Sequence, residues 1–414
     1  MPKIAFVGAG SVEFTRNLLG DILAFPALAE SEIALHDINP ERLETAELLA
    51  GRVAQTLGVS PRVSASLDRR EALEGADYVI NSIQVGGHAA TVRDHEIPAR
   101  YGLRQTIGDT LGIGNDMAEV CPGAWLLNYT NPMAMICQLV YQGTPQTQIV
   151  GLCHSVQGTM EMIAGLCGVP VEEVTYFGAG INHQTFLYRL EHGGESLYPR
   201  LDEAIERNPD LLRRVRVDMY RRLGYFPTES SEHSAEYSPW YMRHDSEVER
   251  FRIPVADLVG RGEEGLEEYE RVKRELATGE PLEIERSWEY ASLIINSIET
   301  GEPCVIYGNV RNAGLITNLP DGICVEVPCL VDRTGVSPVH VGDVAPQCAA
   351  LNRTFSNVCD LTVRAVLEGR PDHVRHAAML DPNTAATLEL DQIDALVAEL
   401  LEAYRDMLPE ALRP

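Results

Sequence analysis

Long hydrophobic runs are missing from this sequence of 414 residues. No stretch of about 18 consecutive apolar residues occurs, so neither a membrane-spanning helix nor a membrane partner is expected. The chain also leaves no room for a secretory signal peptide before its first predicted strand, because Met1–Lys3 leads straight into Ile4–Val7.

The sequence also lacks paired cysteines and an excess of basic residues. Its nine cysteines are irregularly spaced without a CxxC pair, which favours a reduced, cytoplasmic protein over a disulfide framework. It carries 34 Lys and Arg against 61 Asp and Glu, a formal net charge of −27. Because nucleic-acid binding needs clustered cations on phosphate groups, a nucleic-acid partner is not expected. The charge argues less strongly against an anionic substrate, since a local basic pocket can override the global field.

What the sequence does contain, from its first residues, is a glycine-rich turn between a strand and a helix. Lys3–Val7 has the apolar pattern of a strand, and Gly8-Ala9-Gly10-Ser11 connects it to a helical pattern. Strand, Gly-x-Gly and helix resemble the start of a dinucleotide-binding unit, in which backbone N–H groups approach a pyrophosphate. Glu13 stands where the third glycine of that fingerprint would be. We expect the two glycines and Ser11 to contact the dinucleotide.

A second strand pattern, Glu32–His36, is followed by the acidic residue Asp37. A carboxylate at this place accepts hydrogen bonds from the hydroxyls of the adenosine ribose and repels a 2′-phosphate. Asp37 therefore favours NAD over NADP as the cofactor. The alternative is an ordinary α/β turn with a surface aspartate.

Strands and helices alternate through the first part of the chain, which predicts a parallel sheet with right-handed crossovers. The predicted strands are Lys3–Val7, Glu32–His36, Arg62–Leu67, Asp77–Val85, Ala124–Tyr129 and Ile149–Leu152. The predicted fold class is α/β, with a Rossmann-like doubly wound parallel sheet that binds NAD over residues 1–152. An α+β catalytic and oligomerisation domain with C-terminal helices is expected over residues 153–414.

Three asparagines, Asn81, Asn128 and Asn131, lie at the carboxyl ends of predicted strands. Ligands bind outside this edge of an open α/β sheet, so the three amides are expected to form a polar rim. We expect Asn81 and Asn128 to bind the cofactor. A single asparagine at such a place is more often a loop cap.

A thiol and an imidazole follow another apolar strand. Ile149–Leu152 leads into Cys153 and His154, and a second histidine, His183, comes later behind Gly180. Cysteine and histidine are a metal-ligand pairing. The alternative is a buried thiol and a loop histidine held by a hydrogen bond.

One crossover is too short for its place in the sheet. Between Gly114 and the strand at Trp125, only Asn115–Val120 has a helical pattern, whereas a parallel crossover normally takes about a dozen residues or more. We therefore expect residues to be missing here, so that Gly114 and Asn115 lack the Cα–Cα spacing of about 3.8 Å that a trans peptide imposes.

Taken together, these motifs resemble glycoside hydrolase family 4, whose glycosidases depend on NAD and a divalent metal. The motifs that carry the likeness are Gly8–Ser11, Leu35–Asp37, Asn81–Gly87, Asn128–Pro132, Cys153–Val156, Gly180–His183, Thr228–Tyr237, Asn318–Pro320 and Glu326–Pro328. Cys153–Val156 is similar to the α-galactosidase branch, whereas the phospho-glycosidase branches usually carry Asp or Asn after the cysteine. The chain departs from the family after Gly112–Gly114, where members continue with a basic, apolar helix.

The resemblance implies a glycosidase mechanism that does not use two carboxylates. NAD⁺ takes the hydride from C3 of the sugar, and a metal on the C2 and C3 oxygens polarises the resulting carbonyl. A base then removes the acidified C2 proton, the C1 substituent leaves, water adds, and the hydride returns to C3. The family places a tyrosine in the role of the base. Tyr237 is the candidate here, and Tyr241 is the reserve.

The same resemblance assigns the remaining site residues. Cys153 and His183 match the metal ligands. His154 stands where the phospho-glycosidase branches have an acid, and it is counted with the catalytic residues. Asn131 and Asn182 are expected to bind the substrate. Thiolate ligation favours zinc, but the family typically uses Mn²⁺, and with sugar oxygens and water completing the shell Mn²⁺ is expected.

The expected activity is hydrolysis of α-galactosides by a homodimer or homotetramer. An α-glucosidase, an α-glucuronidase or an α-galacturonidase of the same family would differ by a few pocket contacts. A NAD-dependent hydroxy-acid dehydrogenase shares the fold, but it would need an arginine for the substrate carboxylate. A non-catalytic NAD-sensing module would tolerate loss of Cys153 and His183.

Overall fold

The structure is a computed structural model that describes residues 1–106, 120–279 and 282–414. Its first six strands are parallel, in the order β3-β2-β1-β4-β5-β6. This is the order of a doubly wound dinucleotide-binding sheet, so the predicted parallel sheet is confirmed. The strands are Lys3–Val7 (β1), Glu32–His36 (β2), Arg62–Ser66 (β3), Tyr78–Asn81 (β4), Trp125–Asn128 (β5) and Gln148–Leu152 (β6).

Burial and capping explain the elements of this half. All residues of β4 are buried, as expected for a strand covered by helices on both faces. The sequence predicts a helix over Pro40–Leu57 with Asn39 as its cap, and α2 (Pro40–Leu57) begins there, because the Asn39 side chain accepts hydrogen bonds from two backbone N–H groups of its first turn. The other helices of this half are α1 (Val12–Leu23), α3 (Arg69–Leu73), α4 (Gly87–Arg100), α6 (Met133–Gly143) and α7 (Ser155–Cys167).

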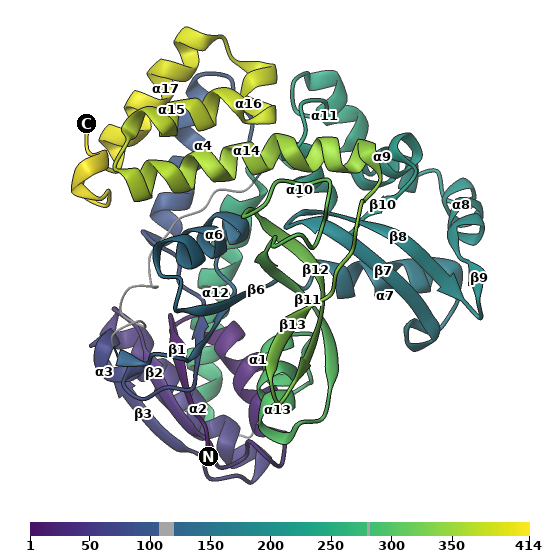
Figure 1. The fold of residues 1–414 in the computed structure, drawn as a ribbon. Helices are drawn as coiled ribbons and strands as arrows, with labels where there is room; N and C mark the ends of the chain where they lie inside the picture. The colour runs from purple at the N-terminus through teal and green to yellow at the C-terminus, as the bar shows by residue number, and fades with distance from the viewer. Residues whose placement is uncertain (107–119, 280–281) are drawn as a thin grey trace.

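The sheet continues beyond β6 with antiparallel strands, as Figure 1 shows. Strand β11 (Cys304–Arg311) pairs with β6, and β12, β7, β8 and β10 follow in that order. The described chain thus forms one 13-stranded sheet, and the predicted α+β second half is confirmed. The remaining strands are Val174–Ile181 (β7), Gln184–His192 (β8), Glu195–Ser196 (β9), Phe226–Pro227 (β10), Cys324–Asp332 (β12) and Gly335–Pro338 (β13).

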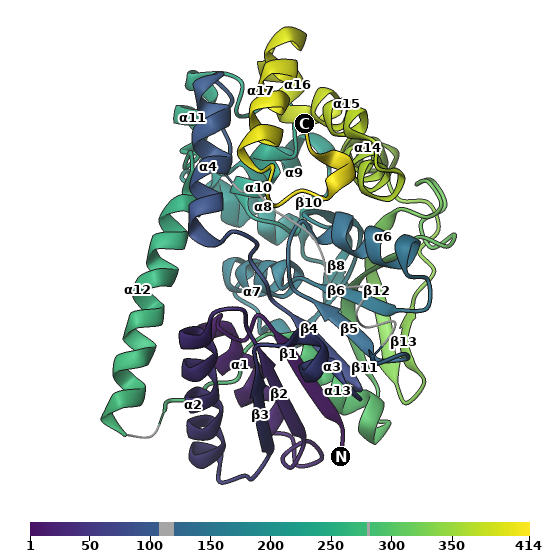
Figure 2. The same ribbon diagram turned by 90° about the vertical axis from the view of Figure 1, so that its left-hand side faces the viewer.

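Helices cover the second half of the sheet, and the C-terminal ones gather at the top of Figure 1. These are α14 (Pro346–Glu368), α15 (Pro371–Leu380), α16 (Pro382–Thr387) and α17 (Leu390–Ala403). The others are α8 (Tyr198–Arg207), α9 (Val215–Leu223), α10 (Ser231–Glu236), α11 (Asp245–Phe251), α12 (Asp257–Thr278) and α13 (Tyr290–Thr300), with 3₁₀ turns at Val171–Glu173, Leu211–Arg213 and Glu410–Leu412. Figure 2 shows α12 along one side of the molecule, with its upper end beside α4.

The structure differs from the sequence expectation at the last helix. The apolar stripe of Leu396, Leu400, Leu401 and Tyr404 predicts a helix over Gln392–Leu408, but α17 ends at Ala403. The chain turns there instead, because the Met407 N–H donates to the Tyr404 carbonyl at 2.8 Å. The expected break between Gly114 and Asn115 lies outside the described residues.

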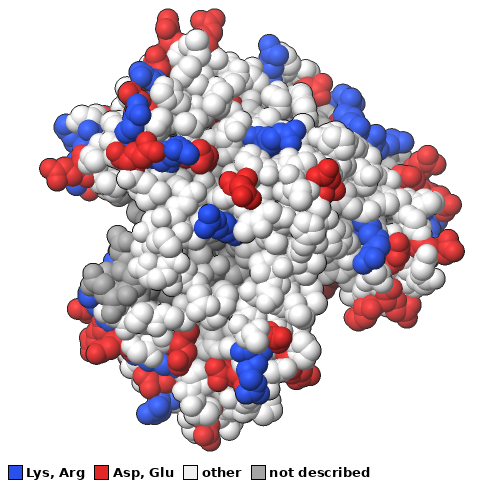
Figure 3. Space-filling model, viewed as in Figure 1, with Lys and Arg blue, Asp and Glu red and all other residues white. Residues whose placement is uncertain are grey.

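No described helix combines the length and the hydrophobicity needed to cross a bilayer. On the face drawn in Figure 3, basic side chains are scattered among acidic ones instead of gathering into one patch. This distribution agrees with the excess of acidic residues in the sequence.

Gly151 of β6 lies at the seam where the parallel strands meet the antiparallel ones. It pairs with Asn309 of β11. A Cβ atom at Gly151 would lie 2.5 Å from Met133 Sδ, 2.7 Å from Cys137 Sγ and 2.9 Å from Asn309 Cβ. A close-packed interior cannot absorb such an overlap without displacing helix α6, which carries both sulfur atoms.

We predict that Gly151→Ala lowers the free energy of unfolding by about 1–3 kcal/mol, as overpacking a core does. Urea denaturation followed by circular dichroism measures the change. Gly165→Ala in α7 is the control, because nothing lies within 4 Å of its Cβ position, and it should leave stability unchanged or raise it. Equal midpoints for Gly151→Ala and the wild type would contradict the tight seam.

Candidate active site

The glycine-rich turn between β1 and α1 lets the backbone pass close to the segment that follows β4. Gly8 has a φ of +89°, and a Cβ atom on it would lie 2.7 Å from the Ser82 carbonyl oxygen. Ser11 is the N-cap of α1, but its side chain makes no capping hydrogen bond. The N–H groups of the first helical turn are therefore left for a ligand, which suits the pyrophosphate of a dinucleotide.

Asp37, at the end of β2, lies against this turn. Its Oδ2 accepts a hydrogen bond from the Gly10 N–H, and its Oδ1 accepts one from the Asn39 N–H, both at 2.9 Å. Each carboxylate oxygen can accept a further hydrogen bond. Contact between Asp37 and a ribose stays a prediction, and the half-buried side chain leaves room for it.

Two of the predicted rim asparagines bind one another. Asn81 Nδ2 donates to Asn128 Oδ1 at 2.8 Å, and Asn128 Nδ2 donates to the Thr130 carbonyl at 2.8 Å. Asn128 is fully buried and holds the Asn81 side chain in place, and its predicted contact with a cofactor stays a prediction. The buried Oδ1 of Asn81 has no hydrogen-bond partner within the described part of the chain. An unpaired buried acceptor of this kind is normally satisfied by a ligand or by water.

A cavity of 350 Å³ lies outside the carboxyl ends of β1, β4, β5 and β6. It reaches from Ser11 at the start of α1, past Asn131, to Cys153 and His154 behind β6. Its volume falls in the range of sites for small ligands, about 300–1,000 Å³. The cavity therefore joins the glycine-rich turn to Cys153, one of the two predicted metal ligands.

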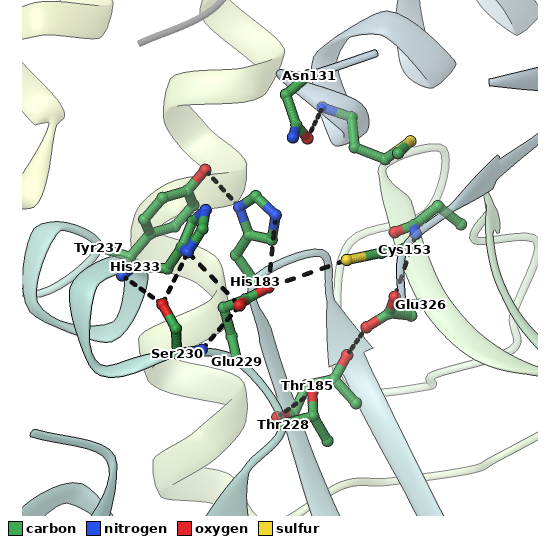
Figure 4. A network of polar contacts seen from close by, with 12 residues as sticks. Asn131, Cys153, His183, Thr185, Thr228, Glu229, Ser230, His233, Tyr237 and Glu326 are labelled. Atoms are coloured by element: carbon green, nitrogen blue, oxygen red, sulfur yellow. Dashed lines mark hydrogen bonds and ion pairs between the residues drawn. The ribbon is translucent and has the colours of Figure 1, made fainter. Parts of the chain in front are cut away.

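Three separate segments bring Cys153, His183 and Glu229 together (Figure 4). Cys153 follows β6, His183 lies in the turn between β7 and β8, and Glu229 lies between β10 and α10. His183 has a φ of +63°, which is uncommon for a residue other than glycine and is often found at functional sites.

The distances within this cluster suit a bound cation. Glu229 Oε2 is 3.9 Å from Cys153 Sγ and 3.6 Å from His183 Nε2. All three ligand atoms lie within 4.8 Å of one another. In protein zinc sites, N, O and S ligands lie about 2.0–2.3 Å from the metal, so one ion can reach all three atoms. Two of these residues, Cys153 and His183, are the predicted metal ligands.

Burial shapes the protonation of the cluster. It lowers the pKa of His183 to about 3, and the neighbouring His233 adds to the effect. Burial also raises the pKa of the Cys153 thiol, and the negative charges of Glu229 and Glu326 raise it further. A neutral imidazole is the form that binds metals, and a bound cation deprotonates a coordinating thiol.

Tyr237 lies on the opposite side of His183 from Glu229. Its hydroxyl is 3.2 Å from His183 Nδ1, and the two rings meet edge to face. Tyr237 follows the last residue of α10, a helix whose N-cap is Ser230, with the Ser230 hydroxyl accepting the His233 N–H at 3.3 Å. Gln184 Nε2 donates to the Tyr237 carbonyl at 2.8 Å. The structure thus brings the predicted base next to a predicted metal ligand.

The two other predicted catalytic residues, Tyr241 and His154, lie outside the cluster of Cys153, His183 and Glu229. The Tyr241 hydroxyl donates to Asp218 Oδ2 at 2.9 Å, and the residue lines a second cavity, of 490 Å³, away from the metal-ligand cluster. Tyr241 therefore does not share the surroundings of Tyr237. The side chain of His154 is 65% exposed, lines the first cavity, and has its Nδ1 3.7 Å from Glu289 Oε1.

The two predicted substrate ligands lie at the edge of the same region. Asn131 lines the first cavity, and its Oδ1 accepts the Met133 N–H at 3.2 Å. Asn182 precedes His183 and is buried, and among the described residues its Nδ2 has no partner. Contact of either amide with a substrate stays a prediction.

Two family models match the chain. "Family 4 glycosyl hydrolase" matches residues 3–115 and 112–169, and "Family 4 glycosyl hydrolase C-terminal domain" matches residues 178–384. The chain belongs to glycosyl hydrolase family 4. The resemblance drawn from the sequence motifs is therefore confirmed. The two stretches of the first match overlap at residues 112–115, and the missing residues expected there stay a prediction.

Curated relatives of this family 4 member include two α-galactosidases. The α-galactosidase of Bacillus subtilis (strain 168) is 40% identical over 431 residues, covering 99% of this chain and 100% of the relative. The α-galactosidase of Rhizobium meliloti (strain 1021) is 36% identical, and the match covers 99% of this chain and 89% of the relative. A crystal structure of a 6-phospho-alpha-glucosidase from gut microorganisms, in complex with NAD and Mn²⁺, superposes with a TM-score of 0.80 at 20% identity, covering 99% of both chains. The last likeness shows the shared fold.

Glu229 is the member of the cluster that the sequence did not single out. It lies in the family motif Thr228–Tyr237, but one acid among 61 cannot be selected by composition. Its position directly before the Ser230 N-cap fixes its direction, because its Oε1 accepts the Ser230 N–H at 2.7 Å.

We predict that Glu229→Gln weakens Mn²⁺ binding about tenfold or more, because the amide removes the negative charge from the cluster. Isothermal titration calorimetry with MnCl₂ alone measures the affinity, and Cys153→Ser should act in the same direction while the protein stays folded. Glu232→Gln, a charge change in the adjacent helix α10 and outside the cluster, is the matched control. Wild-type affinity in Glu229→Gln would remove this residue from the metal site.

Proposed function

We propose that this family 4 member hydrolyses α-galactosides with NAD⁺ and a divalent metal, of which Mn²⁺ is the expected one. The observation that carries the proposal is the cluster of Cys153, His183 and Glu229 next to a cavity that begins at the dinucleotide turn. The two α-galactosidase relatives support the choice of substrate. Cytoplasmic location and a homodimeric or homotetrameric assembly are further parts of this proposal.

The residues of the chain suit both NAD⁺ and a divalent metal. The Gly8 turn, the uncapped start of α1 and the unpaired Asn81 Oδ1 suit a dinucleotide. A thiolate, an imidazole and a carboxylate suit a divalent transition metal, and sugar oxygens in the remaining positions favour Mn²⁺ over zinc. When bound, NAD⁺ and the metal would supply hydride acceptance at C3 of the sugar and polarisation of the C2 and C3 oxygens.

Tyr237 is proposed to take the C2 proton. If His183 uses Nε2, which faces Glu229, as its ligand atom, the neutral ring carries its proton on Nδ1. That N–H then donates to the Tyr237 oxygen, which lies 3.2 Å away. A hydrogen bond of this kind stabilises the phenolate, the form that can act as a base.

The lining of the first cavity supports a neutral sugar. None of its described lining residues is Lys or Arg, and the sequence of residues 107–119 contains neither. A 6-phosphate or a uronic acid carboxylate would lack a permanent positive partner there, and an unpaired buried charge is costly. The same lack of an arginine argues against a hydroxy-acid dehydrogenase. A neutral galactoside or glucoside meets no such obstacle.

A panel of 4-nitrophenyl glycosides with NAD⁺ and Mn²⁺ tests this proposal. We expect the α-galactoside to be hydrolysed fastest, with loss of activity on chelation by EDTA. Fastest turnover of the α-glucoside or of a uronide would replace the substrate assignment. Net accumulation of NADH, followed at 340 nm, would instead indicate a dehydrogenase.

We predict that hydrolysis in D₂O places carbon-bound deuterium at C2 of the released galactose, because a proton removed by Tyr237 exchanges with solvent before water adds. Nuclear magnetic resonance of the product measures the label. Tyr237→Phe should lose turnover while NAD⁺ still binds, and Tyr241→Phe should retain both. A product with only protium at C2 would mean direct displacement at C1 and no role for a C2 base.

A further inference from the structure

One wall of the first cavity comes from helix α4. Ala90, Thr91 and Asp94 line it, and their spacing puts them on one face of the helix. Thr91 Oγ1 accepts a hydrogen bond from Gln84 Nε2 at 2.9 Å. Asp94 is the one carboxylate among the described residues that line the cavity.

The C-terminal end of the chain holds Asp94 in place. Tyr404, the residue after α17, donates its hydroxyl hydrogen to Asp94 Oδ1 at 2.6 Å. The Ala90 carbonyl lies 2.9 Å from the same hydroxyl, but a phenol has one hydrogen, and the shorter contact to a charged acceptor takes it. Burial, followed by the hydrogen bond to Asp94, raises the pKa of Tyr404, so the tyrosine remains a donor.

The second oxygen of Asp94 is left for a ligand. Its Oδ2 makes no hydrogen bond to the described residues, although the carboxylate is half-buried. A carboxylate is an acceptor only, so the ligand groups that suit it are O–H or N–H donors. Sugar hydroxyls are such donors, and a hydrogen bond to a charged acceptor is about twice as strong as one between neutral groups. The phosphates of a dinucleotide would be repelled.

We propose that Asp94 binds hydroxyl groups of the glycoside, and that Tyr404 acts as a positioning residue that aims its free oxygen into the cavity. This inference rests on the proposed glycosidase function and names a residue that selects a neutral, hydroxyl-rich substrate. It also gives the C-terminal segment a part in the site, although Tyr404 and Asp94 lie 310 positions apart in the sequence.

The chain offers a matched control for the positioning role. Tyr101, the C-cap of α4, donates its hydroxyl to Glu399 Oε2 of α17 at 2.8 Å. This contact joins the C-terminal end of α4 to α17 through the same pair of chemical groups, a phenol and a carboxylate, but neither residue lines the cavity. Loss of this hydrogen bond therefore reports on docking of α17 alone.

The experiment compares KM and kcat for 4-nitrophenyl α-galactoside in Asp94→Asn, Tyr404→Phe and Tyr101→Phe, with NAD⁺ affinity measured separately by fluorescence titration. Loss of a hydrogen bond to a charged group should raise KM about tenfold or more in Asp94→Asn, and a smaller rise is expected in Tyr404→Phe. Tyr101→Phe should leave KM unchanged, and NAD⁺ affinity should stay constant in all three. Asp94→Glu, which keeps the charge, should recover part of the loss and guards against misfolding of Asp94→Asn.

Several outcomes would overturn the inference. An unchanged KM in folded Asp94→Asn, with the wild type active, removes Asp94 from the sugar site and leaves the glycosidase function standing. A loss of NAD⁺ affinity instead would assign Asp94 to the cofactor. Equal effects of Tyr404→Phe and Tyr101→Phe would reduce Tyr404 to a docking contact. A wild-type protein that hydrolyses no glycoside of the panel overturns the inference together with the proposed function.

Discussion

The pairing register at the seam of the sheet is the constraint on which the candidate site depends. A row of partners crosses four adjacent strands, β6, β11, β12 and β7, and consists of Gly151, Asn309, Glu326 and Gly180. Cys153 follows soon after the first member of the row and His183 soon after the last, so the pairing register ties the positions of both ligands to one row. A slip of one residue in any pairing would turn the side chains to the other face and separate the ligands.

Polar groups at the interior of this row secure the register. Asn309 Nδ2 donates to Glu326 Oε1 at 3.2 Å and to the Gly151 carbonyl at 3.3 Å, and Thr185 donates to Glu326 Oε2 at 2.6 Å. Burial raises the pKa of Glu326 to about 7, and the nearby Glu229 adds to the effect. Buried carboxylates lower the free energy of unfolding unless hydrogen bonds or a cation compensate their charge. The seam is therefore less stable than an apolar core would be, at the place where the chemistry is proposed.

Local patterns in the sequence predict much of this arrangement. The glycine turn, Asp37 and the alternating strands predict the parallel half, and the apolar run before Cys153 predicts where that thiol emerges. What local patterns cannot predict are pairings between distant segments. Glu229 meets Cys153 although the strands that precede them, β10 and β6, are not neighbours in the sheet. Asp94 meets Tyr404 only because the end of α17 lies beside α4. The resemblance ranks Tyr237 before Tyr241, but local patterns do not explain why, whereas their different partners, His183 and Asp218, do.

The continuity of the sheet from β3 to β10 also bears on how the molecule moves. Many enzymes with a dinucleotide-binding half enclose their substrate by rotating two bodies about a hinge. A rotation between the halves here would break the backbone ladder between β6 and β11 and disturb the residues beside Cys153. Entry and exit of a substrate are therefore left to the helices that flank the cavity, while the strands that carry the ligands act as one rigid frame.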